Sequence, residues 1–103
     1  MNTTESTITL NNARHSFELI IEGKLSKVDF FQPDEHTLAL THTEVHPDLE
    51  GKGVGSNLLK QVLAYVEQHN QKIVPLCPFV STYIKRHPDW QRVVSTEYDV
   101  ADF

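Results

Sequence analysis

Three glycines stand at alternate positions in EGKGVG, residues 50–55, and an apolar, helix-forming segment follows them directly. The first N–H groups of a helix have no intrahelical partner and the helix dipole is positive there, so bare backbone at this point can receive an anion. The alternative is structural: Gly51 and Gly53 would supply a turn with positive φ, and Gly55 would let the helix pack closely on a sheet. Because one turn seldom needs three glycines, we favour a phosphate-binding loop.

Hydrophobic periodicity around this loop predicts a mixed α/β (α+β) fold. Alternation on the third strand places Leu38, Leu40, His42 and Glu44 on one face. Glu22-Gly23 is a tight turn between the first two strands, and Pro88 stops the last helix. Strands are expected at 15–21, 24–31, 37–45 and 72–79, and helices from Val54 to about His69 and over 80–90.

Length and composition suit a single domain spanning residues 1–103, with the ends 1–6 and 95–103 expected to be disordered. The N-terminus lacks the pattern of a signal peptide and no apolar run could span a bilayer, so we expect a cytoplasmic protein that does not bind membranes. The net charge of −5 argues against nucleic-acid binding. Cys77 is the only cysteine and the six histidines lack ligand spacing, so no metal site is predicted.

The loop fits neither of two common phosphate motifs. A Walker A loop needs Ser or Thr after its lysine, whereas Gly53 follows Lys52, and a dinucleotide fingerprint needs a third glycine where Ser56 stands. The segment instead resembles the coenzyme A pyrophosphate loop of the GNAT superfamily of N-acetyltransferases, Gln/Arg-x-x-Gly-x-Gly/Ala. Gly53 and Gly55 match this pattern, and Glu50 departs from its Gln or Arg.

The resemblance extends from about residue 12 to Trp90, because HTEVHPDLEGKGVGSNLL and IVPLCPFVSTYIKRHPDW look like two blocks of small, single-domain, YjdJ-like GNAT proteins. It implies a compact, mostly antiparallel sheet with two main helices, in which the strand ending at Val45 and the strand 72–77 splay apart around pantetheine. Pro75 suits a broken ladder. The coenzyme-binding residues implied are Val45, Gly51, Lys52, Gly53, Val54, Gly55, Ser56, Cys77 and Pro78. The chain is too short for the helices that cover the acceptor in larger relatives, so an open acceptor groove is expected.

Acetyl transfer to an amine needs a base and, for the leaving thiolate, an acid. Glu44 and His42 are candidate bases at the strand end nearest the loop; the alternative is that both are solvated residues on an exposed face. Tyr83 resembles the tyrosine that many GNAT enzymes place near the coenzyme sulfur as general acid, and its alternative is an ordinary aromatic.

Cys77 has three interpretations. It is an inert, buried thiol with a raised pKa, a wall of the pantetheine channel, or a nucleophile that accepts the acetyl group. From the sequence we expect a channel wall and direct attack by the amine. Lys85, Arg86 and His87 suit the adenosine 3′-phosphate, or else form a solvated helix end.

The sequence therefore predicts an acetyl-CoA-dependent N-acetyltransferase acting on a small cationic amine or a lysine-type peptide, as a monomer or weak dimer. A second hypothesis is a non-catalytic coenzyme A-binding module that serves as a sensor or partner protein. A third is a structural domain in which the glycines only shape a turn.

Overall fold

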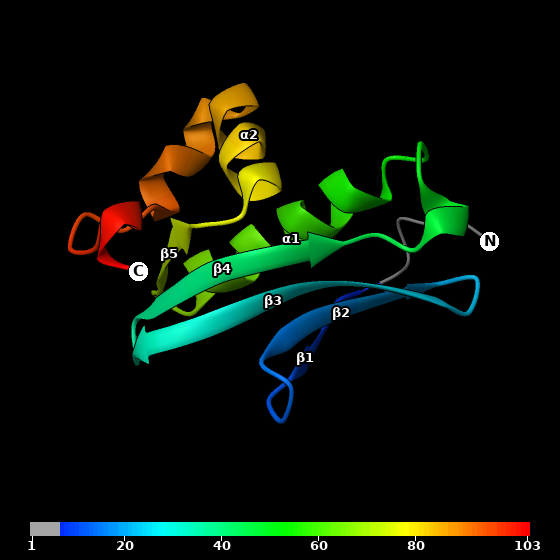
Figure 1. Cartoon of the computed structure of the whole chain (residues 1–103), viewed down its shortest axis with the longest axis horizontal. Helices are drawn as coiled ribbons and strands as arrows, with labels where there is room; N and C mark the ends of the chain where they lie inside the picture. Colours follow the sequence, from blue (N-terminus) through cyan, green and yellow to red (C-terminus); the bar gives the residue numbers. More distant parts are fainter. Residues whose placement is uncertain (1–6) are drawn as a thin grey trace.

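The computed structural model describes residues 7–103, and a five-stranded sheet in the order β1-β2-β3-β4-β5 organises it (Figure 1). Neighbouring strands pair antiparallel from β1 to β4, whereas β5 pairs with β4 in parallel. The predicted mixed α/β class and mostly antiparallel sheet are confirmed. The strands are β1 (Thr9–Asn11), β2 (Ser16–Ile21), β3 (Lys24–Asp34), β4 (Thr37–Glu44) and β5 (Lys72–Pro75). Strand β1 has three residues, too few for periodicity to predict it.

The β2–β3 hairpin turns at Glu22 and Gly23, whose φ angles are 54° and 75°. Two consecutive positive φ angles are typical of the type I′ turn that matches strand twist. Strand β3 continues to Asp34, beyond the predicted end at residue 31, and its pairing with β4 shifts register between Phe31 and Asp34. Pro33 lies in this irregular stretch, where a missing N–H breaks no regular ladder.

Two α-helices follow, α1 (Val54–Gln68) and α2 (Pro78–Arg86), with short 3-10 helices η2 (Pro47–Leu49), η3 (Pro88–Val93) and η4 (Val100–Asp102). Helix α1 matches its prediction. Helix α2 starts two residues before the predicted start at Val80, and β5 correspondingly stops short of 79. Pro78 occupies the first turn of α2, a position where proline loses no hydrogen bond and its fixed φ already suits a helix.

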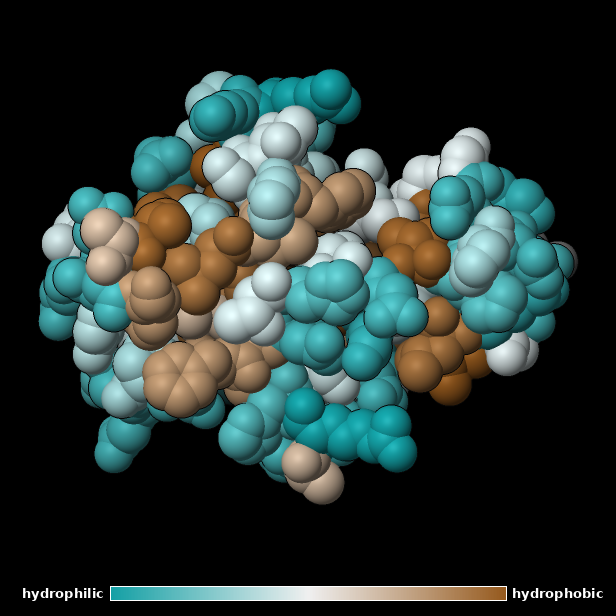
Figure 2. Space-filling view, viewed as in Figure 1, coloured by the Kyte–Doolittle hydropathy of each residue, from teal (hydrophilic) through white to brown (hydrophobic). Residues whose placement is uncertain are grey.

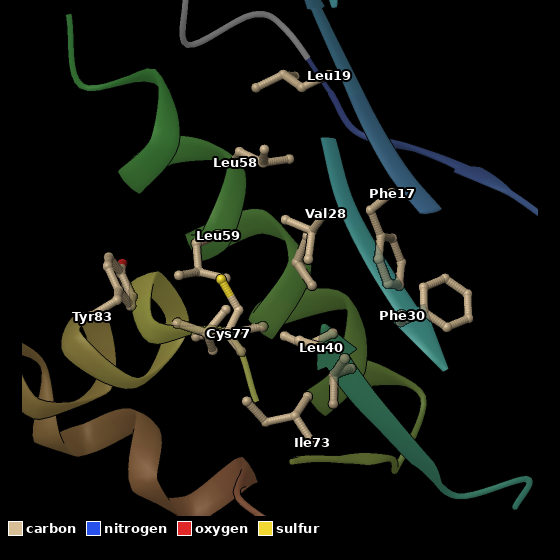
Figure 3. Close-up of a cluster of buried hydrophobic side chains, with 14 of the residues drawn as sticks. Phe17, Leu19, Val28, Phe30, Leu40, Leu58, Leu59, Ile73, Cys77 and Tyr83 are labelled. Atoms are coloured by element: carbon tan, nitrogen blue, oxygen red, sulfur yellow. The ribbon is translucent and has the colours of Figure 1, made fainter. Parts of the chain in front are cut away.

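The core lies between α1 and one face of the sheet (Figure 3). One stripe of α1 is buried: Leu58, Leu59, Val62, Leu63 and Val66. It packs against Phe17 and Leu19 of β2, Val28 and Phe30 of β3, and Leu40 of β4. Burial of an apolar stripe at this spacing is what holds a helix of this length on a sheet.

Among the described residues, the opposite face of the sheet carries no α-helix, and the C-terminal segment with η4 lies against one part of it. In Figure 1 the sheet lies in front of α1, so Figure 2 shows this uncovered face, with hydrophilic surface in its middle and hydrophobic patches to either side. Ile20 and Leu25 face each other across β2 and β3 and are 62% and 41% exposed.

The C-terminal segment, residues 95–103, crosses from β5 to β3. The Ser95 N–H donates to the Ile73 carbonyl (2.8 Å), and the Tyr98 hydroxyl donates to Asp34 (2.8 Å). Phe103 places its ring centroid 6.2 Å from that of Phe31. The expected disorder of this segment does not match the structure, because these contacts hold it against β5 and β3. The acidic composition of the segment gives no indication of such contacts. Residues 1–6 lie outside the described residues.

Candidate functional site

The glycine loop presents bare backbone at the start of α1. Gly53 is the N-cap in the left-handed conformation (φ 75°), and Gly51 has φ 79°. A Cβ atom built on either glycine meets open space, whereas one on Gly55 would lie 2.8 Å from the Phe79 ring and 3.2 Å from Val45. Gly51 and Gly53 therefore do supply a turn with positive φ, and Gly55 does allow the helix to pack closely. Beyond them, no described side chain caps α1, so its first amides face the space before the loop.

This space is a hollow of about 450 Å³. Thr43 of β4 and Val45, which directly follows that strand, form one wall, the loop forms another, and Phe79 of α2 closes a third side. The full lining is Thr43, Val45, Leu49, Glu50, Gly51, Gly53, Val54, Gly55, Ser56 and Phe79. An anionic ligand entering here meets the positive end of the α1 dipole.

Two further hollows continue from the first. One of about 380 Å³ is lined by Lys52, Lys60, Tyr83 and His87, and another of about 450 Å³ is lined by Arg86 with Tyr83 and His87. Ser56 lines all three hollows, so they form one groove over the N-terminus of α1, which we name the α1 groove.

Strands β4 and β5 separate beside this groove. Their ladder ends at Leu40 and Pro75, and the last link is the Cys77 N–H donating to the Leu40 carbonyl (2.9 Å). From residue 41 onward β4 runs on while the chain after β5 turns into α2. The splay implied by the resemblance is present, and Pro75 stands at its last rung.

Cys77 lies at the apex of the splay, as the N-cap of α2. Its Sγ is 3.6 Å from the Thr43 hydroxyl oxygen. The thiol donates to this oxygen. Burial raises the pKa of the Cys77 thiol, but the Thr43 side chain and the nearby backbone N–H groups of Val80, Phe79 and Thr43 lower it by more, so the pKa lies below its ordinary value. The direction of this pKa shift is opposite to the one expected for an inert thiol, because the backbone N–H groups at the helix N-terminus favour the thiolate.

A bulge in β4 decides where His42 and Glu44 point. Phe30 pairs with Leu40 but Asp29 pairs with His42, so Thr41 is an extra residue. Val28 and its partner Thr43 therefore share the helix-covered face.

His42 and Glu44 consequently face the uncovered side of the sheet, their Nε2 and Oε2 atoms 3.6 Å apart and both side chains 60% exposed. The prediction that they share a face with Leu38 and Leu40 is wrong, since the bulge reverses the alternation.

Comparison with known proteins decides what this arrangement is. The family model described as GCN5-related N-acetyl-transferase matches residues 16–93. The chain belongs to the GCN5-related N-acetyltransferase family. A solution structure of a GCN5-like candidate N-acetyltransferase from Staphylococcus aureus is 25% identical, covers 92% of this chain and 91% of its own, and superposes with a TM-score of 0.68. No match is found among curated proteins.

Membership of the GCN5-related N-acetyltransferase (GNAT) family makes the chain an acyltransferase. The groove offers uncapped amides at one end, cationic side chains beside them and an apolar wall that includes Val45 and Phe79, which together suit a pyrophosphate, a further phosphate and a pantetheine arm. Cys77 itself lines none of the three hollows as described. The residues present therefore fit coenzyme A.

Tyr83 of α2 lines the two hollows that also include Lys60, Arg86 and His87. Figure 3 shows its side chain on the α2 ribbon, to one side of Cys77. Its ring centroid is 4.3 Å from that of His87. Burial raises the pKa of the Tyr83 hydroxyl, and a weaker hydrogen bond with Trp90 opposes this, so the hydroxyl keeps its proton at neutral pH. A protonated phenol lining the groove is suited to proton donation.

The cations are arranged differently from the sequence-based prediction. Arg86 and His87 line the groove, whereas Lys85 lines none of its three hollows as described. Lys60 does line it, although this residue is not among the site residues expected from the sequence. Its position four residues after Ser56 on α1 is the signal that could have identified it.

The described residues, 7–103, contain no group of three metal-ligating side chains and no helix with the length and apolarity to cross a bilayer.

Proposed function

We propose that this GNAT-family protein transfers the acetyl group of acetyl-CoA to a cationic amine. The single observation that supports this best is the meeting of two features at one place: the uncapped, glycine-rich start of α1 and the splay of β4 from β5 with Cys77 at its apex. The test is to incubate the protein with acetyl-CoA and a panel of amines and to follow release of coenzyme A and the mass of each amine.

In this proposal residues 51–56 hold the pyrophosphate through backbone N–H groups. Val45 and Pro78 flank the pantetheine arm, and Lys52, Lys60 and Arg86 neutralise phosphate charge. The bound coenzyme supplies an activated thioester. The protein's own contribution is to hold that thioester beside Cys77 and Thr43.

The environment of Cys77 supports a covalent route over the direct attack expected from the sequence. The thiolate of Cys77 would attack the acetyl carbonyl, forming a new C–S bond while the coenzyme's C–S bond breaks, and Tyr83 would protonate the departing sulfur. An unprotonated amine would then take the acetyl group from Cys77, whose sulfur leaves as thiolate, and the second proton of the amine nitrogen would return to the Tyr83 phenolate. The backbone N–H groups at the start of α2 would stabilise the Cys77 thiolate both before and after the transfer.

His42 and Glu44 would serve the amine from the uncovered face. The amine arrives as an ammonium ion, and a proton acceptor must remove one proton before attack. The Glu44 carboxylate lies 3.6 Å from the His42 imidazole, so the two proposed proton acceptors stand together on this face. We therefore propose both residues as bases for the acceptor amine, which would approach the splay from the uncovered face of the sheet.

A non-catalytic coenzyme-binding module remains the second candidate, because Glu50 replaces the usual Gln or Arg of the loop and lines the groove with a negative charge. Such a module would bind coenzyme A and leave the thioester intact with every amine tested.

Tyr83→Phe is expected to lower kcat about 10- to 100-fold and to leave coenzyme A affinity nearly unchanged, because only the proton donor is removed. Steady-state rates and calorimetric titration with coenzyme A measure the two quantities. Tyr65→Phe, on the far side of α1, is the matched control. A loss of affinity equal to the loss of rate would assign Tyr83 a packing role.

Replacing Lys60 and Arg86 by Ala is expected to weaken coenzyme A about 10-fold or more, while dephospho-coenzyme A is affected much less, since it lacks the 3′-phosphate. Lys85→Ala, which removes a neighbouring charge outside the groove, should affect both ligands equally and slightly. An equal loss for both ligands in the double variant would contradict this placement of the phosphate.

A further inference from the structure

The thiol proposed as nucleophile does not open onto the α1 groove. Cys77 is 6% exposed, and none of the three hollows includes it among its described lining residues. It adjoins the groove through Thr43, which lines the first hollow and whose hydroxyl oxygen lies 3.6 Å from Sγ. A thioester in the groove is therefore separated from the sulfur by the side chains that form this part of the wall.

Phe79 is the exposed part of that wall. It follows Cys77 by two residues in the first turn of α2, lines two of the three hollows including the one at Thr43, and is 41% exposed. The backbone here is fixed, because the Cys77 N–H donates to the Leu40 carbonyl (2.9 Å) and the Cys77 carbonyl accepts from the Ser81 N–H (3.1 Å). Thr43 is held in the β3–β4 ladder. Rotation of the exposed Phe79 side chain is therefore the change that would widen this wall without moving the backbone.

The Phe79 ring rests against Gly55 of α1. A Cβ atom at Gly55 would lie 2.8 Å from Phe79 Cζ and 3.2 Å from Val45 Cγ2. The ring thus reaches from α2 to α1 and stands beside Val45, which follows β4, so side chains from both sides of the splay meet at this point. The absence of a side chain at Gly55 gives the ring its place, and a methyl group there would displace it.

A ring in this position restricts what can pass from the groove to the sulfur. An acetyl group ends in a single methyl group, whereas longer acyl chains need more room beside the reacting carbonyl. Close-fitting apolar walls discriminate between substrates that differ by a methylene group by about 10-fold or more.

We propose that Phe79 is a specificity-determining residue, whose ring limits the size of the electrophile that reaches Cys77 and so favours acetyl over longer acyl groups. The part that concerns acyl groups rests on the proposed acetyl transfer. The size limit on the thiol itself does not require the coenzyme, so the two are tested separately.

The size limit is measured first, without coenzyme, by alkylation of Cys77, the only cysteine. N-methylmaleimide and N-phenylmaleimide react with a thiolate in the same way and differ in size. Relative to free cysteine, the parent should discriminate against N-phenylmaleimide. In Phe79→Ala the rate with N-phenylmaleimide divided by that with N-methylmaleimide should rise about 10-fold, because the obstructing ring is gone. Intact-protein mass spectrometry follows both reactions.

This ratio separates access from acidity, because a change in the thiolate fraction alone would alter both rates equally. The matched control is Phe31→Ala, which removes another exposed ring, 54% exposed, from the uncovered face of the sheet. It should keep the ratio of the parent. An unchanged ratio in Phe79→Ala, or an equal rise in Phe31→Ala, would overturn the proposal.

Gly55→Ala tests the same contact from α1. Its added methyl group should displace the Phe79 ring and change the ratio of the two alkylation rates. In the double variant Gly55→Ala/Phe79→Ala the methyl group has no ring to displace, so the ratio should equal that of Phe79→Ala. The same change in both backgrounds would show that the ring is not the barrier.

Turnover gives the second readout. In Phe79→Ala, kcat/KM for butanoyl-CoA relative to acetyl-CoA should rise about 10-fold, while Phe31→Ala should match the parent. Equal relative values in the parent and Phe79→Ala would overturn the selection of acyl groups. If no acyl group is transferred while the maleimide ratio rises as expected, the proposed acetyl transfer fails and the size limit at Cys77 stands.

Discussion

Cys77→Ala is expected to lower kcat about 1,000-fold while coenzyme A binds nearly as well as to the parent, because the variant lacks the attacking sulfur and keeps the groove. The thiolate is available because Cys77 caps α2 and contacts Thr43, which together place the pKa of the thiol below its ordinary value. Alkylation of Cys77 by iodoacetamide should accordingly reach half its maximal rate at a lower pH than that of a free cysteine, since only the thiolate reacts.

The decisive measurement is intact-protein mass spectrometry within one turnover. The parent should gain about 42 Da, one acetyl group, lose it on addition of amine, and show no such adduct as Cys77→Ala. Thr43→Val, which removes one hydrogen bond to the sulfur, should slow adduct formation without abolishing it. A Cys77→Ala enzyme that keeps most of its kcat would establish direct attack by the amine, as the sequence first led us to expect.

Gly53→Glu is expected to weaken acetyl-CoA binding about 100-fold or more, because a carboxylate would stand in front of the amides that receive the pyrophosphate. Backbone strain is the competing cause of any loss, since Gly53 has φ 75°. Gly23 offers a matched control: it has the same φ of 75° and equally open space for a Cβ, but lies in the β2–β3 turn.

Gly23→Glu should therefore share the strain of Gly53→Glu and retain coenzyme binding. Calorimetry gives the affinities and circular dichroism checks the fold of both variants. Equal affinities in the two variants would show that the loop does not hold the pyrophosphate.

Much of the coenzyme side could be predicted from local patterns. A glycine loop joined to an amphipathic helix is a contiguous signal, and it correctly placed the start of α1 beside β4. The hairpin at Glu22-Gly23 and the break at Pro75 were equally local, because each depends on the backbone preference of one or two residues.

The uncovered face of the sheet depends on features that periodicity does not record. The extra residue Thr41 leaves the apolar pattern of 37–40 intact, yet it reverses the faces of His42, Thr43 and Glu44. The C-terminal segment is acidic and lacks periodicity, and its order comes from single contacts such as Tyr98 with Asp34, which lie 64 residues apart. Long-range contacts of this kind are invisible to local propensity.

An amide NMR titration with acetyl-CoA tests most directly whether the coenzyme occupies the groove between α1 and the splayed strands. We expect saturable shifts that are largest at residues 51–56, at 43–45 where β4 ends, and at 77–80 where α2 begins, with the uncovered face little affected. Saturation with these amides unmoved, or with the largest shifts on the uncovered face of the sheet, would contradict the account.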